Sequence, residues 1–263
     1  MKNKGTKTFA QIMIERARTL YQEPDILAHF SNPDRNINRK GLCGWELSLC
    51  KEYIQENGHI LVAGCAGGQE SFAFLRAGYQ VTGVDIVPEF IEAARKQAHK
   101  KGFKDRARFE LVNDFHWPVR DSACDAVSML ANFLTYLPSR DIRKTVFKEC
   151  FRVLKPGGVV MMQGADRTHP NINLKRPKWE PKRIENLKKK QEWNLMKEKG
   201  VEVKLYHPCK GDVNAKTLVP NYSVDPREIW EEVEKCNLRI IRFQGEQNPE
   251  SRFAFVTLVA VKD

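Results

Sequence analysis

The feature that most constrains the fold of this chain is a glycine-rich turn between two apolar segments, within residues 59–85. Residues 60–63, before the turn, are apolar at every position, which is typical of a parallel strand covered on both faces. The turn, GCAGG at residues 64–68, permits a tight reversal and a close approach of backbone amides to a ligand. A helix and a second strand then lead to Asp85. A carboxylate at that place can accept hydrogen bonds from the hydroxyls of a ribose.

Two ligand classes use such a turn, and the spacing of the glycines separates them. A dinucleotide site requires the pattern G-x-G-x-x-G, but those positions hold Gly64, Ala66 and Gln69 here. The stretch LVAGCAGG, residues 61–68, instead resembles motif I of the class I S-adenosylmethionine-dependent methyltransferases, commonly hhDhGCGxG. Val62 stands where that family usually has an acid, and Ala66 stands where it has its middle glycine.

Two later stretches extend the resemblance. Residues 113–130, NDFHWPVRDSACDAVSML, are similar to the family pattern of an acid after strand three, a proline, and an acid opening strand four. Residues 154–162, LKPGGVVMM, resemble the family's helix end, proline-glycine-glycine turn and fifth strand, and are the most specific match. We expect Pro156 to end the helix, and Gly157 and Gly158 to supply positive φ angles.

The carboxyl-terminal part of the chain carries a further sign of the family. Residues 226–237 predict a helix with Asp225 as its cap, followed by two strands at residues 238–244 and 253–261. A reversed last strand after such a hairpin is typical of these methyltransferases rather than of dinucleotide enzymes. The helix positions expected to face inward are Ile229, Trp230, Val233 and Cys236.

The resemblance implies the fold class and a division of the chain. The fold is a doubly wound, Rossmann-like α/β sheet of seven strands, mostly parallel with an antiparallel last strand, and with helices on both faces. Residues 1–57 form an N-terminal helical cap, with helices expected at residues 8–20 and 45–55. Residues 58–263 form the methyltransferase domain, with a basic insertion at about 165–222 in which the family keeps substrate-recognition elements.

The resemblance also implies S-adenosylmethionine as the cofactor. Asp85 is then the acceptor for the ribose hydroxyls, Asp114 the acceptor for the adenine amino group, and Phe115 a side chain that packs near the adenine ring. The full set of cofactor-binding residues expected on this basis is Ala63, Gly64, Cys65, Gly68, Asp85, Ile86, Asp114, Phe115 and Ala131.

The catalytic residues are expected just after the fifth strand. Methyl transfer from a sulfonium is an in-line displacement, so alignment and desolvation supply much of the rate, and a base is needed only when the acceptor must lose a proton. His169 and Asp166, in the stretch GADRTHPN, are the chosen candidates, and the alternatives near the same edge of the sheet are His116, His207 and Tyr222. His169 is favoured as the base because an imidazole has a suitable pKa range for a phenol, thiol or ammonium acceptor. A surface or capping role for His169 is the alternative.

The charge of the chain bears on the methyl acceptor. The net charge is +11, and the excess of Lys and Arg lies in residues 1–42 and 167–204. Such segments suit an anionic substrate, an acidic partner or nucleic acid, or form solvated helix faces. The sequence Ala-Asn-Phe-Leu at residues 131–134 replaces the [DNS]-P-P-[YF] clamp of enzymes that methylate flipped adenine, so a nucleic acid substrate rests on charge alone. We therefore expect a small-molecule acceptor, with an RNA methyltransferase and a non-catalytic cofactor-binding protein as alternatives.

Cysteine usage and hydropathy bear on location and metal binding. The seven cysteines are odd in number and contain no C-x-x-C pair, so neither a disulfide framework nor a zinc site is indicated and no metal is expected. The apolar run at residues 253–261 is too short to span a membrane, and residues 1–20 lack a signal-peptide pattern. These observations predict a soluble cytoplasmic protein, and they leave its oligomeric state open.

Overall fold

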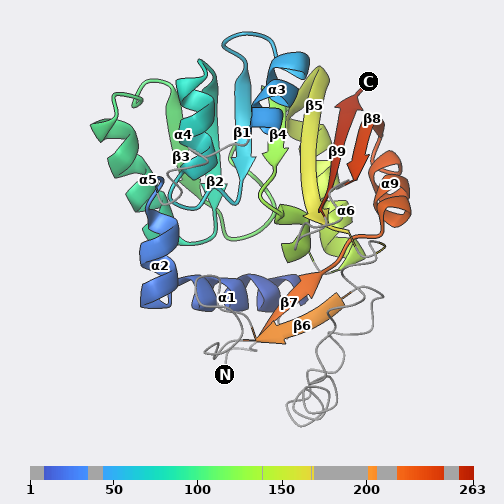
Figure 1. The fold of residues 1–263 in the computed structure, drawn as a ribbon, viewed down its shortest axis with the longest axis horizontal. Helices are drawn as coiled ribbons and strands as arrows, with labels where there is room; N and C mark the ends of the chain where they lie inside the picture. The colour runs from blue at the N-terminus through green and yellow to red at the C-terminus, as the bar shows by residue number, and fades with distance from the viewer. Residues whose placement is uncertain are drawn as a thin grey trace, which may run out of the picture. The chain divides into compact units, whose positions relative to one another are not determined.

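The computed structural model describes residues 9–34, 44–137, 139–166, 168, 201–205, 218–245 and 255–263. Its strands form a seven-stranded sheet with the order β3-β2-β1-β4-β5-β9-β8, and a separate two-stranded sheet of β6 and β7 (Figure 1). This strand order, with helices connecting parallel strands and an antiparallel last strand, confirms the expected Rossmann-like α/β fold class.

The bounds of the elements are as follows. The helices are α1 (Phe9–Tyr21), α2 (Pro24–Ser31), α3 (Gly44–Tyr53), α4 (Gln69–Arg76), α5 (Pro88–Lys100), the 3₁₀ helix η1 (Phe133–Tyr136), α6 (Arg140–Val153) and α9 (Pro226–Glu234). The strands are β1 (His59–Ala63), β2 (Gln80–Asp85), β3 (Ala107–Leu111), β4 (Cys124–Met129), β5 (Leu154–Ala165), β6 (Val201–Leu205), β7 (Leu218–Tyr222), β8 (Leu238–Gly245) and β9 (Phe255–Lys262).

The chain divides into two compact units, one of residues 1–119 with 205–219, and one of residues 120–204 with 220–263. In the first unit, β1, β2 and β3 are paired in parallel, and α4 and α5 connect them. Residues 60–63 of β1 are all buried, as their unbroken apolar pattern predicts. Helix α5 begins at Pro88 and buries an apolar stripe of Phe90, Ile91, Ala94 and Ala98.

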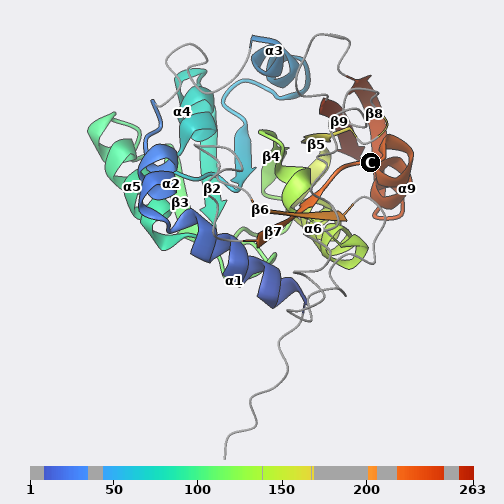
Figure 2. The same cartoon turned by 60° about the horizontal axis from the view of Figure 1, so that its bottom comes forward.

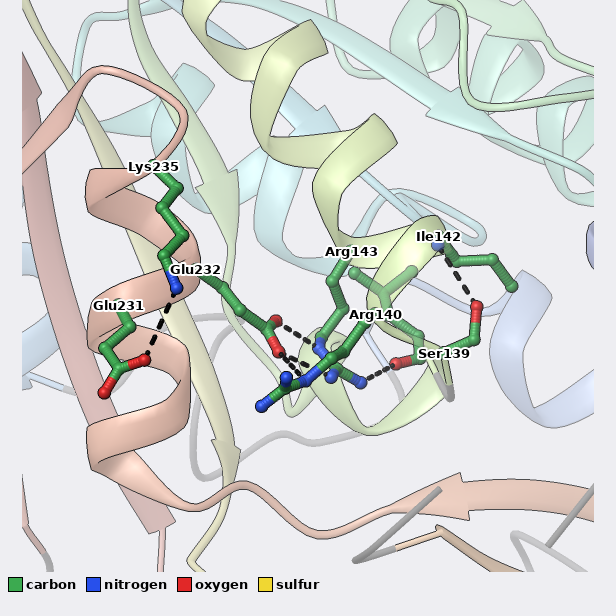
Figure 3. A network of polar contacts seen from close by, with 8 residues as sticks. Ser139, Arg140, Ile142, Arg143, Glu231, Glu232 and Lys235 are labelled. Carbon is green, nitrogen blue, oxygen red and sulfur yellow. Dashed lines mark hydrogen bonds and ion pairs between the residues drawn. The ribbon is translucent and has the colours of Figure 1, made fainter. Parts of the chain in front are cut away.

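In the second unit, β4 and β5 are parallel, whereas β9 is antiparallel to both β5 and β8. The last strand is therefore reversed, as expected. Helices α6 and α9 both begin at side-chain caps. At the start of α6, the Ser139 hydroxyl accepts a hydrogen bond from the Ile142 amide (3.2 Å; Figure 3). At the start of α9, the Asp225 side chain accepts one from the Arg227 amide (3.1 Å).

A buried ion pair joins α6 and α9 (Figure 3). Arg143 is only 1% exposed and binds Glu232 through two nitrogens, with Nε–Oε2 at 2.6 Å and Nη2–Oε1 at 2.8 Å. Its Nη1 also donates to the carbonyl oxygen of Leu137 at 3.1 Å, directly after η1. This planar fork fixes the two helices and the end of η1 relative to one another.

Three details differ from the sequence expectations. Helix α2 is not predicted by the sequence patterns above, although Pro24 at its first turn is a suitable start. Gly157 has a φ of 76°, whereas Gly158 is not left-handed; a Cβ there would lie 2.9 Å from the Lys155 carbonyl oxygen, so close packing requires this glycine. Trp230 is 37% exposed rather than inward, and its ring lies 6.5 Å from that of Phe243.

Other expectations concern the cysteines, membrane spans and metals. Within the described ranges, Cys50, Cys65, Cys124, Cys150 and Cys236 are free and buried. Among the same residues there is no helix with the length and hydrophobicity of a membrane span. The described part of the chain also contains no cluster of His, Cys, Asp and Glu suited to a metal ion.

Candidate cofactor site

The glycine-rich turn folds back against the end of β2. The Cys65 amide donates to the carbonyl oxygen of Val84 (3.0 Å), and the Gly68 amide donates to that of Cys65 (2.9 Å). Gly64, Ala66 and Gly68 have positive φ angles of 67°, 44° and 94°. Ala66 therefore adopts a conformation that usually favours glycine, at the position where the sequence departs from the family pattern.

Asp85 ties this turn to the start of α5. The side chain is 7% exposed, its Oδ2 accepts a hydrogen bond from the Ala66 amide (2.8 Å), and its Oδ1 accepts one from the Val87 amide (3.0 Å). Burial raises the pKa of the Asp85 carboxyl to about 6, while these amide hydrogen bonds and the charge of Arg18 act in the opposite direction. The Ile86 amide is a third backbone donor to this carboxylate, whose two oxygens together offer about four acceptor sites, so the group can still accept a hydrogen bond from a ribose hydroxyl.

Gly67 has a role that the sequence does not reveal. Its amide donates to the carbonyl oxygen of Phe30 at the end of α2 (2.9 Å), and a Cβ there would lie 2.5 Å from the carbonyl oxygens of Phe30 and Ser31. Only a glycine lets α2 pack this closely on the turn. One of the three glycines therefore serves the docking of the N-terminal helices, and a glycine pattern in a sequence cannot distinguish this from a contact with ligand.

Cys65 lies inside the turn as a structural thiol. Burial raises its pKa well above the ordinary value, and the neighbouring Asp85 charge acts in the same direction. A thiol in this state is a poor nucleophile. Its Sγ would lie 2.9 Å from a Cβ placed on Gly83 of β2, so Cys65 fills the space that the second strand leaves open.

The loop after β3 carries the residues expected near adenine. Asp114 is exposed, and its Oδ1 accepts a hydrogen bond from the His116 amide (2.8 Å), which closes a turn within the loop. Phe115 is half-buried beside it. Asn113 in the same loop accepts a hydrogen bond through Oδ1 from Nη2 of Arg18 (3.1 Å), a contact that no sequence motif indicates. The adenine role of Asp114 and Phe115 stays a prediction.

In the second unit, Ala131 follows β4 in an unusual backbone conformation. Ala131 and Asn132 have positive φ angles of 50° and 68°, although neither is glycine. The Gln163 side chain of β5 accepts a hydrogen bond from the Asn132 amide (3.2 Å), and the Thr135 hydroxyl donates to the Asn132 side chain (2.5 Å). Consecutive left-handed residues persist where surrounding contacts hold them, and they often occur at functional sites. The predicted cofactor contact of Ala131 remains untested.

The two catalytic candidates differ in what is described of them. Asp166 is buried at the end of β5, and its Oδ1 accepts hydrogen bonds from the Thr168 amide (2.8 Å) and hydroxyl (2.6 Å). The backbone of Asp166 also forms a bridge with Val224. His169 lies outside the described residues, as does most of the basic insertion. The catalytic assignments of Asp166 and His169 therefore stay predictions.

The strand order, the reversed last strand and an acid at the end of β2 together define the fold of the class I S-adenosylmethionine-dependent methyltransferases. Comparison with known proteins agrees: residues 60–158 match a family described as a methyltransferase domain. A solved S-adenosylmethionine-dependent methyltransferase from Methanosarcina mazei is 27% identical, with a TM-score of 0.62 over 81% of this chain and 96% of that one. The chain thus has the class I methyltransferase fold, and its residues 60–158 are similar to a methyltransferase domain, which supports S-adenosylmethionine as the cofactor.

Two further similarities concern proteins with named substrates or pathways. The ubiquinone biosynthesis O-methyltransferase of Actinobacillus pleuropneumoniae is 32% identical over 127 residues, which are 44% of this chain and 52% of that protein. The chain therefore spans about half the length of this relative. The 1,6-didemethyltoxoflavin-N1-methyltransferase of Burkholderia thailandensis, solved with that substrate and S-adenosylhomocysteine, has a TM-score of 0.62 over 98% of this chain and 92% of its own, at 14% identity.

Proposed function

We propose that this chain transfers a methyl group from S-adenosylmethionine to a small-molecule acceptor. The observation that carries the proposal is the buried Asp85 carboxylate, which links the glycine-rich turn to α5 and lies within the matched residues 60–158. The named relatives and neighbours support a small acceptor, since they include an enzyme of ubiquinone biosynthesis and one solved with 1,6-didemethyltoxoflavin.

In this proposal, the cofactor lies along the turn and the two loops that follow β2 and β3. Asp85 accepts the ribose hydroxyls, Ile86 lies beside them, and Asp114 and Phe115 bind adenine. The residues assigned to the methionyl part and the transferable methyl group are Ala63, Gly64, Cys65, Gly68 and Ala131. The cofactor supplies an electrophilic methyl carbon, so the protein has to align the acceptor and exclude water.

The remaining assignments follow the same proposal. Residues 1–57 act as a helical cap, and residues 58–263 as the catalytic domain with an acceptor-recognition insertion at about 165–222. His169 takes a proton from acceptors that need to lose one, and Asp166 shapes the loop that carries it. The proposal includes a cytoplasmic location; the five free buried thiols support it, because a reducing compartment preserves thiols.

The positive charge of residues 167–204 supports an anionic acceptor, and it also favours a second candidate, an RNA methyltransferase. RNA binding through such a segment is driven by counterion release and weakens steeply as salt rises. Filter binding of bulk tRNA between about 50 and 200 mM salt separates the two. Saturable, salt-dependent binding with methylated tRNA as product supports RNA, whereas methylation of small phenols or amino heterocycles without tRNA methylation supports the first proposal.

The proposed site is tested by calorimetry with S-adenosylhomocysteine. Asp85→Ala is expected to weaken binding at least about tenfold, because ribose loses charge-assisted hydrogen bonds in a buried position. Asp105→Ala is the matched control, since Asp105 is an exposed carboxylate of the same unit. Equal affinity of wild type and Asp85→Ala would remove the ribose assignment. Absence of binding to the wild type would remove the proposed function.

A further inference from the structure

Arg18 of α1 reaches two loops that are far apart in the sequence. Its Nε donates to the carbonyl oxygen of Ile86, after β2, at 2.8 Å. Its Nη2 donates to Oδ1 of Asn113, after β3, at 3.1 Å. In Figure 1, the arrowheads of β1 and β2 point toward α1, and Figure 2 shows α1 and α2 from below. A planar guanidinium with both contacts sets the separation and the angle of the two loops.

These loops are the two that the proposed function assigns to adenosine. Ile86 follows directly after Asp85, the ribose acceptor, and Asn113 precedes Asp114, the adenine acceptor. Arg18 therefore lies at the junction of the ribose and adenine segments, although it belongs to the N-terminal cap. Because the Ile86 contact is made through a backbone oxygen, the identity of the side chain at position 86 does not affect it.

The helix that carries Arg18 is held in place independently of that contact. Tyr21 at the end of α1 packs edge-on against Phe30 of α2 (ring centroids 5.5 Å apart) and against Phe90 of α5 (5.9 Å). The Phe30 carbonyl oxygen accepts the Gly67 amide hydrogen bond of the glycine-rich turn. The cap is thus anchored at α5 and at the turn, so the position of Arg18 is fixed by contacts other than its own.

We propose that Arg18 is a positioning residue, which holds the loop after β2 and the loop after β3 at the separation that an adenosyl group requires. The inference rests on the proposed function, because it takes those loops as the adenosine site. It adds that the N-terminal helices form part of the cofactor site rather than only a cover over it. Arg18 reaches the cofactor through the loops and needs no direct contact with it.

The charged and titratable groups around Asp85 determine the expected pH profile. Arg18 on α1 lowers the pKa of Asp85, and the neutral Cys65 thiol lies in the adjoining turn. Glu70 on α4 acts on Cys65, and Glu89 on α5 accepts a hydrogen bond from Gln22. The ionised carboxylate accepts both ribose hydroxyls best, so affinity should fall as pH drops through the Asp85 pKa of about 6. Loss of Arg18 moves that fall to higher pH.

The test compares Arg18→Ala with Gln22→Ala in the full chain. Gln22 is the control because its side chain joins the same cap to Glu89 of α5 (2.9 Å) rather than to either loop. Calorimetry with S-adenosylhomocysteine from pH 5 to 9 should give about tenfold weaker binding for Arg18→Ala at neutral pH. The pH at the midpoint of the fall in affinity should also be higher in Arg18→Ala than in the wild type. Gln22→Ala should match the wild type in both. The same affinity and midpoint in Arg18→Ala would overturn the inference.

Hydrogen exchange of the unliganded proteins gives a second reading that needs no cofactor. Arg18→Ala should speed exchange in peptides that cover residues 86–88 and 113–116, whereas Gln22→Ala should not. If the wild type fails to bind S-adenosylhomocysteine, the proposed function is wrong, and exchange alone then decides whether Arg18 holds the loops. Unchanged exchange in Arg18→Ala would show that it does not.

Discussion

Each of the two units buries a charged side chain, but one charge is stabilised by backbone amides and the other by a side chain of opposite charge. In the first unit, the Asp85 carboxylate is hydrogen-bonded by backbone amides of Ala66 and Val87, and burial raises its pKa to about 6. In the second unit, the buried Arg143 is paired through two nitrogens with the carboxylate of Glu232. The first charge is held by dipoles and can accept further donors, whereas the second is neutralised within the protein.

Asp85 can accept hydrogen bonds from a ligand, whereas Arg143 holds α6 and α9 together. A buried carboxylate without a bound counterion costs stability, and proteins keep such groups where they act. A bidentate Arg–Glu pair satisfies its own charge and has little left to offer a ligand. Changes at Arg143 should therefore lower the stability of the fold, whereas changes around Asp85 should mainly alter binding and its pH dependence.

The largest expected effect on stability comes from breaking the α6–α9 pair. Arg143→Met should lower the free energy of unfolding by about 3–5 kcal/mol, because Glu232 loses its buried bidentate partner and keeps only the exposed Arg140. Urea unfolding measures this. Arg140→Ala is the control: Arg140 also binds Glu232 (3.1 Å) but is 61% exposed, so about 0–1 kcal/mol is expected. Similar losses in both variants would contradict the distinction between the buried and the exposed arginine.

The next effect is the pH dependence of the folding stability of the unliganded protein. The Asp85 pKa is raised from 3.8 to about 6 in the folded state, so its contribution favours folding below about pH 4 and is lost as pH rises through 6. The loss is about 3 kcal/mol, at about 1.4 kcal/mol for each pKa unit. Affinity for S-adenosylhomocysteine should rise over the same interval.

Asp85→Asn tests this opposition, because it removes the titrating group and keeps its size. The free energies of unfolding of wild type and variant are measured from pH 4 to 8. As pH rises, the wild type should become less stable than the variant by about 3 kcal/mol, because only the wild type loses stability when Asp85 ionises. Parallel curves would mean that Asp85 does not titrate in this range, and the contrast with Arg143 would then lose its basis.

The smallest expected effect concerns the docking of α2 on the turn. Gly67→Ala places a Cβ 2.5 Å from two carbonyl oxygens and should cost about 1–3 kcal/mol in urea unfolding. Gly102→Ala is the control: it is strained at a φ of 75° but has open space around it, so only about 1 kcal/mol is expected. A cost at Gly67 no greater than that at Gly102 would show that α2 moves away freely.

Local patterns predicted most of the elements and part of the site. The apolar run of β1 and the Asp225 cap before α9 lie where the sequence indicates. Each depends on neighbours within a few residues, such as a cap that accepts an amide two or three positions later. The position of Asp85 at the end of β2 also follows from this local reading.

Contacts between distant segments were not predictable in the same way. The pairs Arg18–Asn113, Gly67–Phe30 and Arg143–Glu232 join residues far apart in the chain. A single sequence gives the residue types but not which residues are in contact in the fold. Trp230 illustrates the point: its helical spacing predicts burial, yet it is exposed because the helix stripe that packs inward uses Ile229 and Val233 instead.

The sequence alone determined the α/β class, the glycine-rich turn and the acid that follows the second strand, because periodicity, turn chemistry and capping act over short distances. The tertiary structure decided that Gly67 serves the cap helices, that Arg18 ties two loops together, and that the Asp85 carboxyl has a raised pKa. Those properties arise from burial and from contacts across the fold, which exist only once distant segments of the chain have packed together.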